Sequence, residues 1–154
     1  DTRVAFLLSQ LGFVVSRRFH ETLAPLGLEP RQFLLMRLLA ENEGTSQQAL
    51  GEKLSIPASR MVALLDDLEE RHLLERRPNP TDRRARALHL TDKGRQLLAN
   101  TLGAAVRYEQ EIAAPLTMDE RAQLAQLLRR LAVHHHLVID VHPALTLDDE
   151  RCRS

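Results

Sequence analysis

The chain has 154 residues, enough for one compact domain with an added helical layer and too few for two independent hydrophobic cores. Its 6 glycines, 7 prolines and 3% aromatic residues favour helices over a β-sandwich or a β-barrel. The formal net charge is zero, so only the placement of the charges, and not their sum, can indicate a nucleic-acid partner.

The first predicted element is a helix over residues 4–23, where apolar residues recur at three- and four-residue spacings. Its uncharged part, residues 5–16, is well short of the roughly 18 apolar residues of a membrane span. We therefore expect neither a membrane helix nor a signal peptide. A second, short and heavily buried helix is predicted over residues 30–42, because Pro30 suits a first helical turn.

A helix-turn-helix is predicted next, from two short helices with a brief link between them. Residues 45–48 have the sequence of a helix N-terminus, and barely two turns follow them. Pro57 then opens the second helix at a first-turn position, and this helix runs to about His72. Its predicted inner face consists of Met61, Val62, Leu64, Leu65 and Leu68.

A small hairpin is predicted after these helices, because residues 73–77 and 87–90 are too short for helices and flank a stretch rich in turn formers. Between Arg71 and Arg86 the chain has six arginines against two carboxylates, a local excess of four positive charges. The hairpin tip is therefore predicted to be rich in arginine.

Two long helices complete the predicted order. Thr91 caps the first, which runs to about Ala113 with its inward side formed by Leu97, Leu98, Thr101, Leu102, Ala105 and Ile112. The second begins near Thr117, which stands at capping-box spacing from Glu120, and continues towards about Ile139. Its apolar positions are Leu124, Leu127, Leu128, Leu131 and Leu137.

The residues from Pro143 onward are polar enough to be a tail. They include Cys152, the single cysteine, which cannot form an internal disulfide and so indicates a reducing, cytoplasmic location. The predicted fold is mainly α with a small β-hairpin wing.

The helix-turn-helix and the hairpin together predict contact with DNA. The second helix of such a motif lies in the major groove, where each base pair presents a distinct pattern, and Arg60 is the best candidate for base readout. The helix before it would aim its N-terminus at a phosphate, and the hairpin arginines would reach a phosphate or the minor groove. The expected DNA-binding residues are Thr45, Ser46, Gln47, Gln48, Ala58, Ser59, Arg60, Ala63, Asp82, Arg83, Arg84 and Arg86.

Asp82 is predicted to hold the guanidinium of Arg84 in one orientation through a paired hydrogen bond. In isolation, an Asp-Arg-Arg turn is more simply explained as a solvated charged turn. Its position after a helix-turn-helix favours the DNA contact.

Residues 68–76, 78–84 and 88–95 resemble the wing signature of the MarR (multiple antibiotic resistance regulator) family of transcriptional regulators. The resemblance covers residues 4–139, and in such proteins the wing Asp and Arg correspond to Asp82 and Arg84. It implies a winged helix-turn-helix with a helical dimerisation layer, a homodimer, a pseudo-palindromic operator in double-stranded DNA, and a signal that releases the DNA. We accordingly divide the chain into an N-terminal dimerisation helix (1–29), a DNA-binding lobe (30–95), C-terminal dimerisation helices (96–142) and a tail (143–154).

The resemblance also implies a cleft for a small aromatic or phenolic ligand. The candidate residues are Phe13, Arg17, His20 and Met36, although ordinary packing is the simpler explanation for each. A cysteine switch is not expected, because the first helix has no cysteine. His134, His135 and His136 do not predict a metal site, since adjacent helical residues point about 100° apart.

The leading functional hypothesis is a sequence-specific transcriptional repressor released by a small molecule. The alternative is a winged-helix protein-interaction or architectural module without sequence-specific readout of DNA. We expect no enzyme and no cofactor, because the sequence shows no glycine-rich phosphate loop, no nucleophile motif and no metal-ligand spacing.

Overall fold

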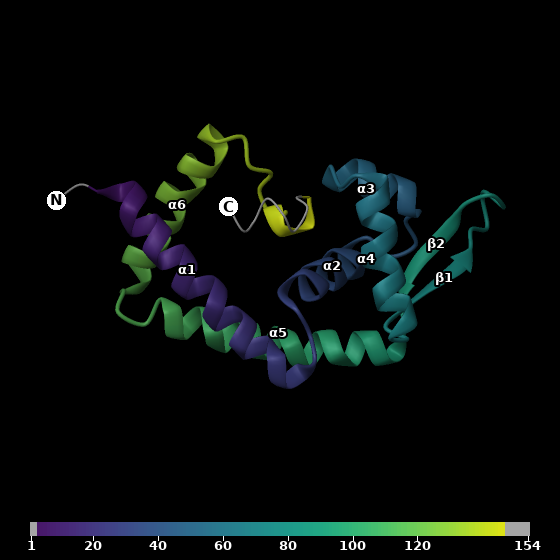
Figure 1. The fold of residues 1–154 in the computed structure, drawn as a ribbon, viewed down its shortest axis with the longest axis horizontal. Helices are drawn as coiled ribbons and strands as arrows, with labels where there is room; N and C mark the ends of the chain where they lie inside the picture. Colours follow the sequence, from purple (N-terminus) through teal and green to yellow (C-terminus); the bar gives the residue numbers. More distant parts are fainter. Residues whose placement is uncertain (1–2, 147–154) are drawn as a thin grey trace.

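The computed structural model describes residues 3–146, and their helices and hairpin form an elongated helical layer joined to a compact lobe (Figure 1). The layer contains α1 (Val4–Leu23), α5 (Asp92–Ile112) and α6 (Met118–His134), and the lobe contains α2 (Pro30–Glu41), α3 (Gln47–Leu54), α4 (Ala58–Glu70), β1 (Leu74–Pro78) and β2 (Arg86–Leu90). Two single 3₁₀ turns are η1 (Ala24–Leu26) and η2 (Pro143–Leu145). This architecture confirms the predicted winged helix-turn-helix with a helical layer.

The helices begin where local capping chemistry allows. The Ser46 hydroxyl accepts a hydrogen bond from the Ala49 amide at the start of α3, and Thr91 does the same for the Gly94 amide at the start of α5. Thr117 and Glu120 form the predicted reciprocal capping box of α6. The hydrogen bonds that the Glu120 carboxylate accepts from Thr117 lower the pKa of Glu120.

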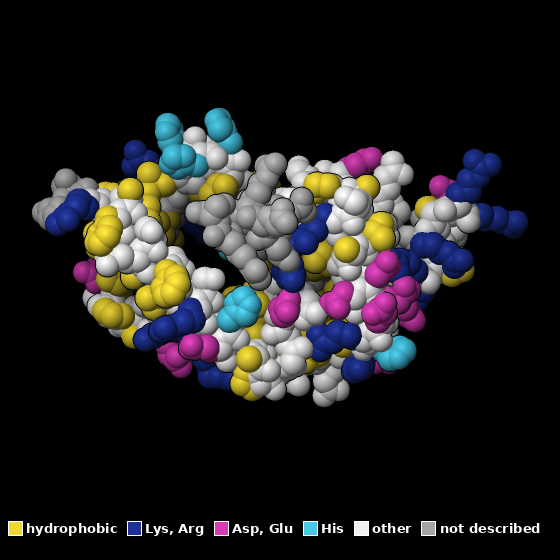
Figure 2. Space-filling model, viewed as in Figure 1, with side chains coloured by type: hydrophobic (Ala, Val, Ile, Leu, Met, Phe, Trp, Pro, Cys, Tyr) yellow, Lys and Arg dark blue, Asp and Glu magenta, His cyan; other side chains and the backbone are white. Residues whose placement is uncertain are grey.

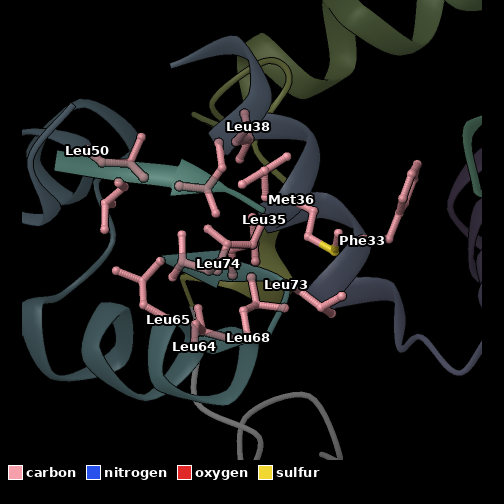
Figure 3. Close-up of a cluster of buried hydrophobic side chains, with 14 of the residues drawn as sticks. Phe33, Leu35, Met36, Leu38, Leu50, Leu64, Leu65, Leu68, Leu73 and Leu74 are labelled. Carbon is pink, nitrogen blue, oxygen red and sulfur yellow. The ribbon is translucent and has the colours of Figure 1, made fainter. Parts of the chain in front are cut away.

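The hydrophobic core lies in the lobe, where leucines from α2, α3, α4 and the hairpin meet (Figure 3). Three aromatic rings connect the lobe to the helical layer: Phe19 of α1 lies 5.8 Å from Phe33 of α2 and 5.1 Å from Tyr108 of α5, measured between ring centroids. The Tyr108 hydroxyl also donates to the Val15 carbonyl at 2.8 Å, so α1 and α5 are joined by a directional contact.

The hairpin is antiparallel, with Leu74 opposite Leu90 and Pro78 opposite Arg86. Its second strand is also bonded to the segment before α3, because the Gly44 amide donates to the Leu88 carbonyl at 2.9 Å and the Leu88 amide donates to the Thr45 carbonyl at 3.0 Å. The wing is therefore fixed to the helix-turn-helix by backbone hydrogen bonds at its base.

The start of α5 presses against the base of the wing at Gly94. A Cβ atom at this position would lie 2.1 Å from the Leu73 carbonyl oxygen, so no other residue fits without a shift of the backbone. The Leu73 carbonyl also accepts the Thr91 amide at 3.1 Å. This contact sets the position of the wing relative to the long helix.

Several sequence-based boundaries and burial assignments were wrong. Helix α4 ends at Glu70 because His72 adopts a left-handed backbone with φ of 57°, and Pro57 is its cap and not a first-turn residue. Helix α6 ends at His134, well before Ile139. Val62 and Leu102, both predicted to face inward, are 42% and 40% exposed.

The predicted tail from Pro143 was also wrong for the part that the structure describes. Turn η2 packs against α2, and Leu145 is fully buried within the core of the lobe. Arg37 of α2 adds a hydrogen bond to the Asp140 carbonyl at 3.4 Å. We call residues 138–146 the C-terminal strap, because they lead from α6 back onto the lobe; residues 147–154, with Cys152, lie outside the described residues.

Candidate nucleic-acid interface

The exposed side of α4 changes character along its length. Its first half exposes Ala58, Ser59, Val62 and Ala63, with no carboxylate among them, whereas its second half exposes Asp66, Asp67 and Glu70. Because phosphates repel carboxylates, only the first two turns suit close contact with a duplex.

Arg60, the residue predicted to read a base, is half-buried and less outward than the sequence suggested. Its guanidinium Nε is enclosed by the surrounding atoms. Less of this side chain is therefore exposed to a base edge than the sequence suggested.

At the start of α3, several polar groups predicted to face a phosphate already make hydrogen bonds within the protein. The Thr45 carbonyl is bonded to the wing and the Ser46 hydroxyl to the helix itself. The Gln48 side chain is exposed and donates to Glu52 at 3.1 Å. A groove of about 680 Å³ runs between α3 and α4, with Gln47 and Gln48 on one side and Pro57 and Ala58 on the other.

One guanidinium joins the three elements of this surface. Arg76 of β1 donates to Asp66 at 2.7 Å and to Glu69, both on α4, and to Gln47 of α3 at 3.4 Å. Its side chain is only 19% exposed. The contact holds the wing strand against both helices of the helix-turn-helix, and it also offsets part of the negative charge of two carboxylates in the acidic half of α4.

The sequence analysis did not single out Arg76 or the exposed position of Val62, although both had a signal. Side chains alternate along a strand, so Arg76 shares the face of buried Leu74. Val62 lies about 100° around the helix from buried Met61, outside the inner face that Met61, Leu65 and Leu68 define.

The wing tip carries exposed arginines on a backbone braced by short side chains. Asp82 accepts a hydrogen bond from the Arg84 backbone amide at 2.9 Å, and Asn79 accepts the Thr81 amide at 3.0 Å. The predicted pairing of Asp82 with the Arg84 guanidinium is therefore replaced by a contact to the backbone. Among the described residues, Arg83, Arg84 and Arg86 are exposed and have no ion-pair partner. Figure 2 shows basic side chains projecting at the wing end of the lobe.

Comparison with known proteins decides the family. The model of the MarR family matches residues 26–85. A putative transcriptional regulatory protein for the hcr operon of Thauera aromatica is 37% identical over 116 residues, which are 75% of this chain and 70% of that protein. The chain belongs to the MarR family.

Solved structures agree with this assignment. The transcriptional repressor CouR bound to a 23-mer DNA duplex matches with a TM-score of 0.74 and 36% identity, over 83% of this chain and 91% of CouR. CouR from Rhodococcus jostii RHA1 bound to p-coumaroyl-CoA matches with a TM-score of 0.70 and 28% identity, over 85% and 92% of the two chains. MarR-family proteins are DNA-binding transcriptional regulators that act as dimers, and the family is not one of enzymes.

A surface suited to pairing is present on this MarR-family chain. Helices α1 and α6 expose large apolar side chains, and α6 has no buried residue among those described (Figure 2). The apolar residues that α6 exposes include Leu124, Leu127, Leu128 and Leu131, which are among the apolar positions predicted for this helix. In the single chain these side chains give α6 an apolar face that suits contact with a partner surface.

The four residues predicted to form a ligand cleft are not brought together in the single chain. Met36 is fully buried in the core, whereas Phe13 is 70% exposed. Arg17 is exposed and lies 3.7 Å from the Glu21 carboxylate, and His20 is exposed on the same helix.

The hollow that α1 and α5 do form, about 430 Å³, is instead lined by Arg18, Glu21, Thr22, Tyr108, Glu111 and Ile112. Burial raises the pKa of Tyr108, so its hydroxyl remains a hydrogen-bond donor here.

Within residues 3–146, no group of three or more His, Cys, Asp or Glu side chains is placed to hold a metal ion. No helix in this part of the chain combines the length and apolarity needed to cross a membrane.

Proposed function

We propose that this chain is a repressor that binds a pseudo-palindromic operator as a homodimer and releases it when a small molecule binds. Two features of the lobe carry the proposal. The first half of α4 exposes no carboxylate, and the wing tip exposes Arg83, Arg84 and Arg86, which have no ion-pair partner among the described residues. A helix end that can enter the major groove and cations that can reach phosphates are the two parts that this mode of binding needs.

The proposed division of labour follows the fold. The first two turns of α4 would read base edges through Ser59 and Arg60, with Ala58 and Ala63 permitting close approach, while Gln48 of α3 and the wing arginines would contact phosphates. Residues 1–29 and 96–142 would form the dimer, and residues 30–95 the DNA-binding lobe. The end of the C-terminal strap, from Pro143, would belong with the lobe, because Leu145 is part of its core. We also propose a cytoplasmic location, with the DNA that the protein would regulate.

Selection of bound fragments from a random duplex library tests this function. A regulator is expected to enrich a near-symmetric site with half-site centres about 34 Å apart, and to bind it about a thousandfold more tightly than random DNA at physiological salt. A ratio near one would instead favour the architectural module that lacks sequence-specific readout.

The release by a ligand rests on likeness to CouR, for which a complex with p-coumaroyl-CoA is known. On this chain, the exposed face of α1 offers an aromatic ring at Phe13 and cations at Arg17 and His20, which suit an aromatic acid or its thioester once a second chain covers them. Phenolic acids and their coenzyme A thioesters, titrated against the operator complex, should release DNA from the parent and less readily from Arg17→Ala. Arg107→Ala, on exposed α5, is the matched control; equal release from all three proteins would remove Arg17 from the proposal.

A further inference from the structure

The exposed side of the first half of α4 offers few hydrogen-bonding groups. Of its exposed side chains only Ser59 is polar, and Arg60 is half-buried. Ala58 and Ala63 are small, so the helix backbone can approach the groove closely. Val62 is then the largest exposed apolar side chain on this surface, at 42% exposure.

Val62 is well suited to a fixed apolar contact. A β-branched side chain in a helix strongly prefers one rotamer, so its two methyl groups project in a defined direction without further loss of entropy. One turn further along, Asp66 is held by Arg76 at 2.7 Å, so the nearest carboxylate is already paired with a cation. A base edge can therefore lie against Val62 with the charge of the nearest carboxylate partly offset by Arg76.

We propose that Val62 is a specificity-determining residue that packs against the 5-methyl group of one thymine in each half-site. In the major groove only thymine presents a methyl group, and an isopropyl group cannot satisfy the donors and acceptors of the other bases. The inference rests on the proposed function, because it requires α4 to enter the groove.

The test uses the full chain and the duplex enriched by selection. Each thymine is replaced in turn by deoxyuridine, which lacks only the methyl group, and affinity is measured by fluorescence anisotropy at fixed salt. At one thymine per half-site we expect a loss of about fourfold, the factor that burial of a single methyl group provides, and about fifteenfold when both half-sites are changed.

The same duplexes are then measured with Val62→Ala, so that the change in the protein and the change in the DNA form a double-mutant cycle. This variant should bind the thymine and deoxyuridine duplexes equally, at the affinity with which the parent binds deoxyuridine. Glu70→Ala, at an exposed position in the acidic second half of the same helix, should keep the full dependence of the parent on thymine. If Val62→Ala retains the thymine preference at every position, the contact is refuted. If no duplex is enriched by the parent at all, the proposed function itself fails.

Discussion

Replacing Arg76 with methionine should weaken both the stability of the lobe and its specific affinity for DNA. Methionine keeps much of the length of the side chain but donates no hydrogen bonds, so Asp66, Glu69 and Gln47 lose their common partner. Hydrogen bonds to charged groups contribute about 1.5–3 kcal/mol when buried. Here both carboxylates are roughly half exposed, so solvent screening reduces the expected loss in the free energy of unfolding to about 1–2 kcal/mol.

Urea denaturation at neutral pH measures this loss. The matched control is Arg77→Met, one residue further along β1, because Arg77 is 51% exposed and pairs with Glu75 of its own strand. We expect the control to change the unfolding free energy by no more than about 0.5 kcal/mol. Equal urea midpoints for Arg76→Met and the parent would refute the view that Arg76 fastens the wing to the two helices.

Measurements of DNA affinity can distinguish whether Arg76 positions α4 and the wing or contacts the DNA directly. A residue that positions α4 and the wing should affect specific duplexes more than random ones and leave the dependence of affinity on salt unchanged. A lost phosphate contact would instead lower that salt slope by about one and weaken binding to all sequences. A lowered slope with Arg76→Met would therefore contradict the inward role that its 19% exposure indicates.

Three further outcomes are expected. Arg84→Ala should weaken binding to all duplexes and lower the salt slope by about one, as measured by anisotropy between 50 and 200 mM salt; an unchanged slope would show that this arginine does not contact a phosphate. Gly94→Ala should lower the unfolding free energy by about 2 kcal/mol or more, because its Cβ would lie 2.1 Å from the Leu73 carbonyl oxygen. Gly103→Ala, whose nearest neighbour is the Arg107 side chain at 3.7 Å, should instead gain up to about 1 kcal/mol from helix propensity. Desolvation lowers the pKa of His142 in the folded state, so stability should decline as the pH falls through the ordinary histidine pKa of about 6.5; the urea midpoint of His142→Gln should decline less.

The parts of the fold that sequence predicted well depend on neighbouring residues. Thr91, Thr117 and Glu120 cap helices through hydrogen bonds that reach only three residues, and the structure shows these caps. The Asp82 contact followed the same local logic, since an aspartate side chain commonly bonds the backbone amide two residues on. The sequence analysis was therefore wrong to predict that Asp82 pairs with the Arg84 guanidinium, because the Arg84 backbone amide is the nearer donor.

The parts that sequence predicted poorly depend on surfaces that are distant in the chain. Leu145 lies in a short segment that leads into a run of charged residues, and only the surface of α2 shows why it is buried. The apolar spacing of α6 was real, but a pattern cannot show whether its partner is the same chain or another copy. Arg76 has three partners 7–29 residues away, which no local rule would identify.

The absence of net charge is compatible with DNA binding because the charges are separated in space. Wing arginines without ion-pair partners among the described residues project from one part of the lobe, and the carboxylates of α4 lie in its second half. Arg76 pairs with two of these carboxylates and offsets part of their charge, while Asp67 accepts a hydrogen bond from Gln32. Helix α4 would therefore meet the groove with its N-terminal end, where the helix dipole is positive, and tilt its acidic end away from the phosphates. In that orientation few side chains would reach the bases, and a contact such as the one proposed for Val62 would provide a large share of the specificity.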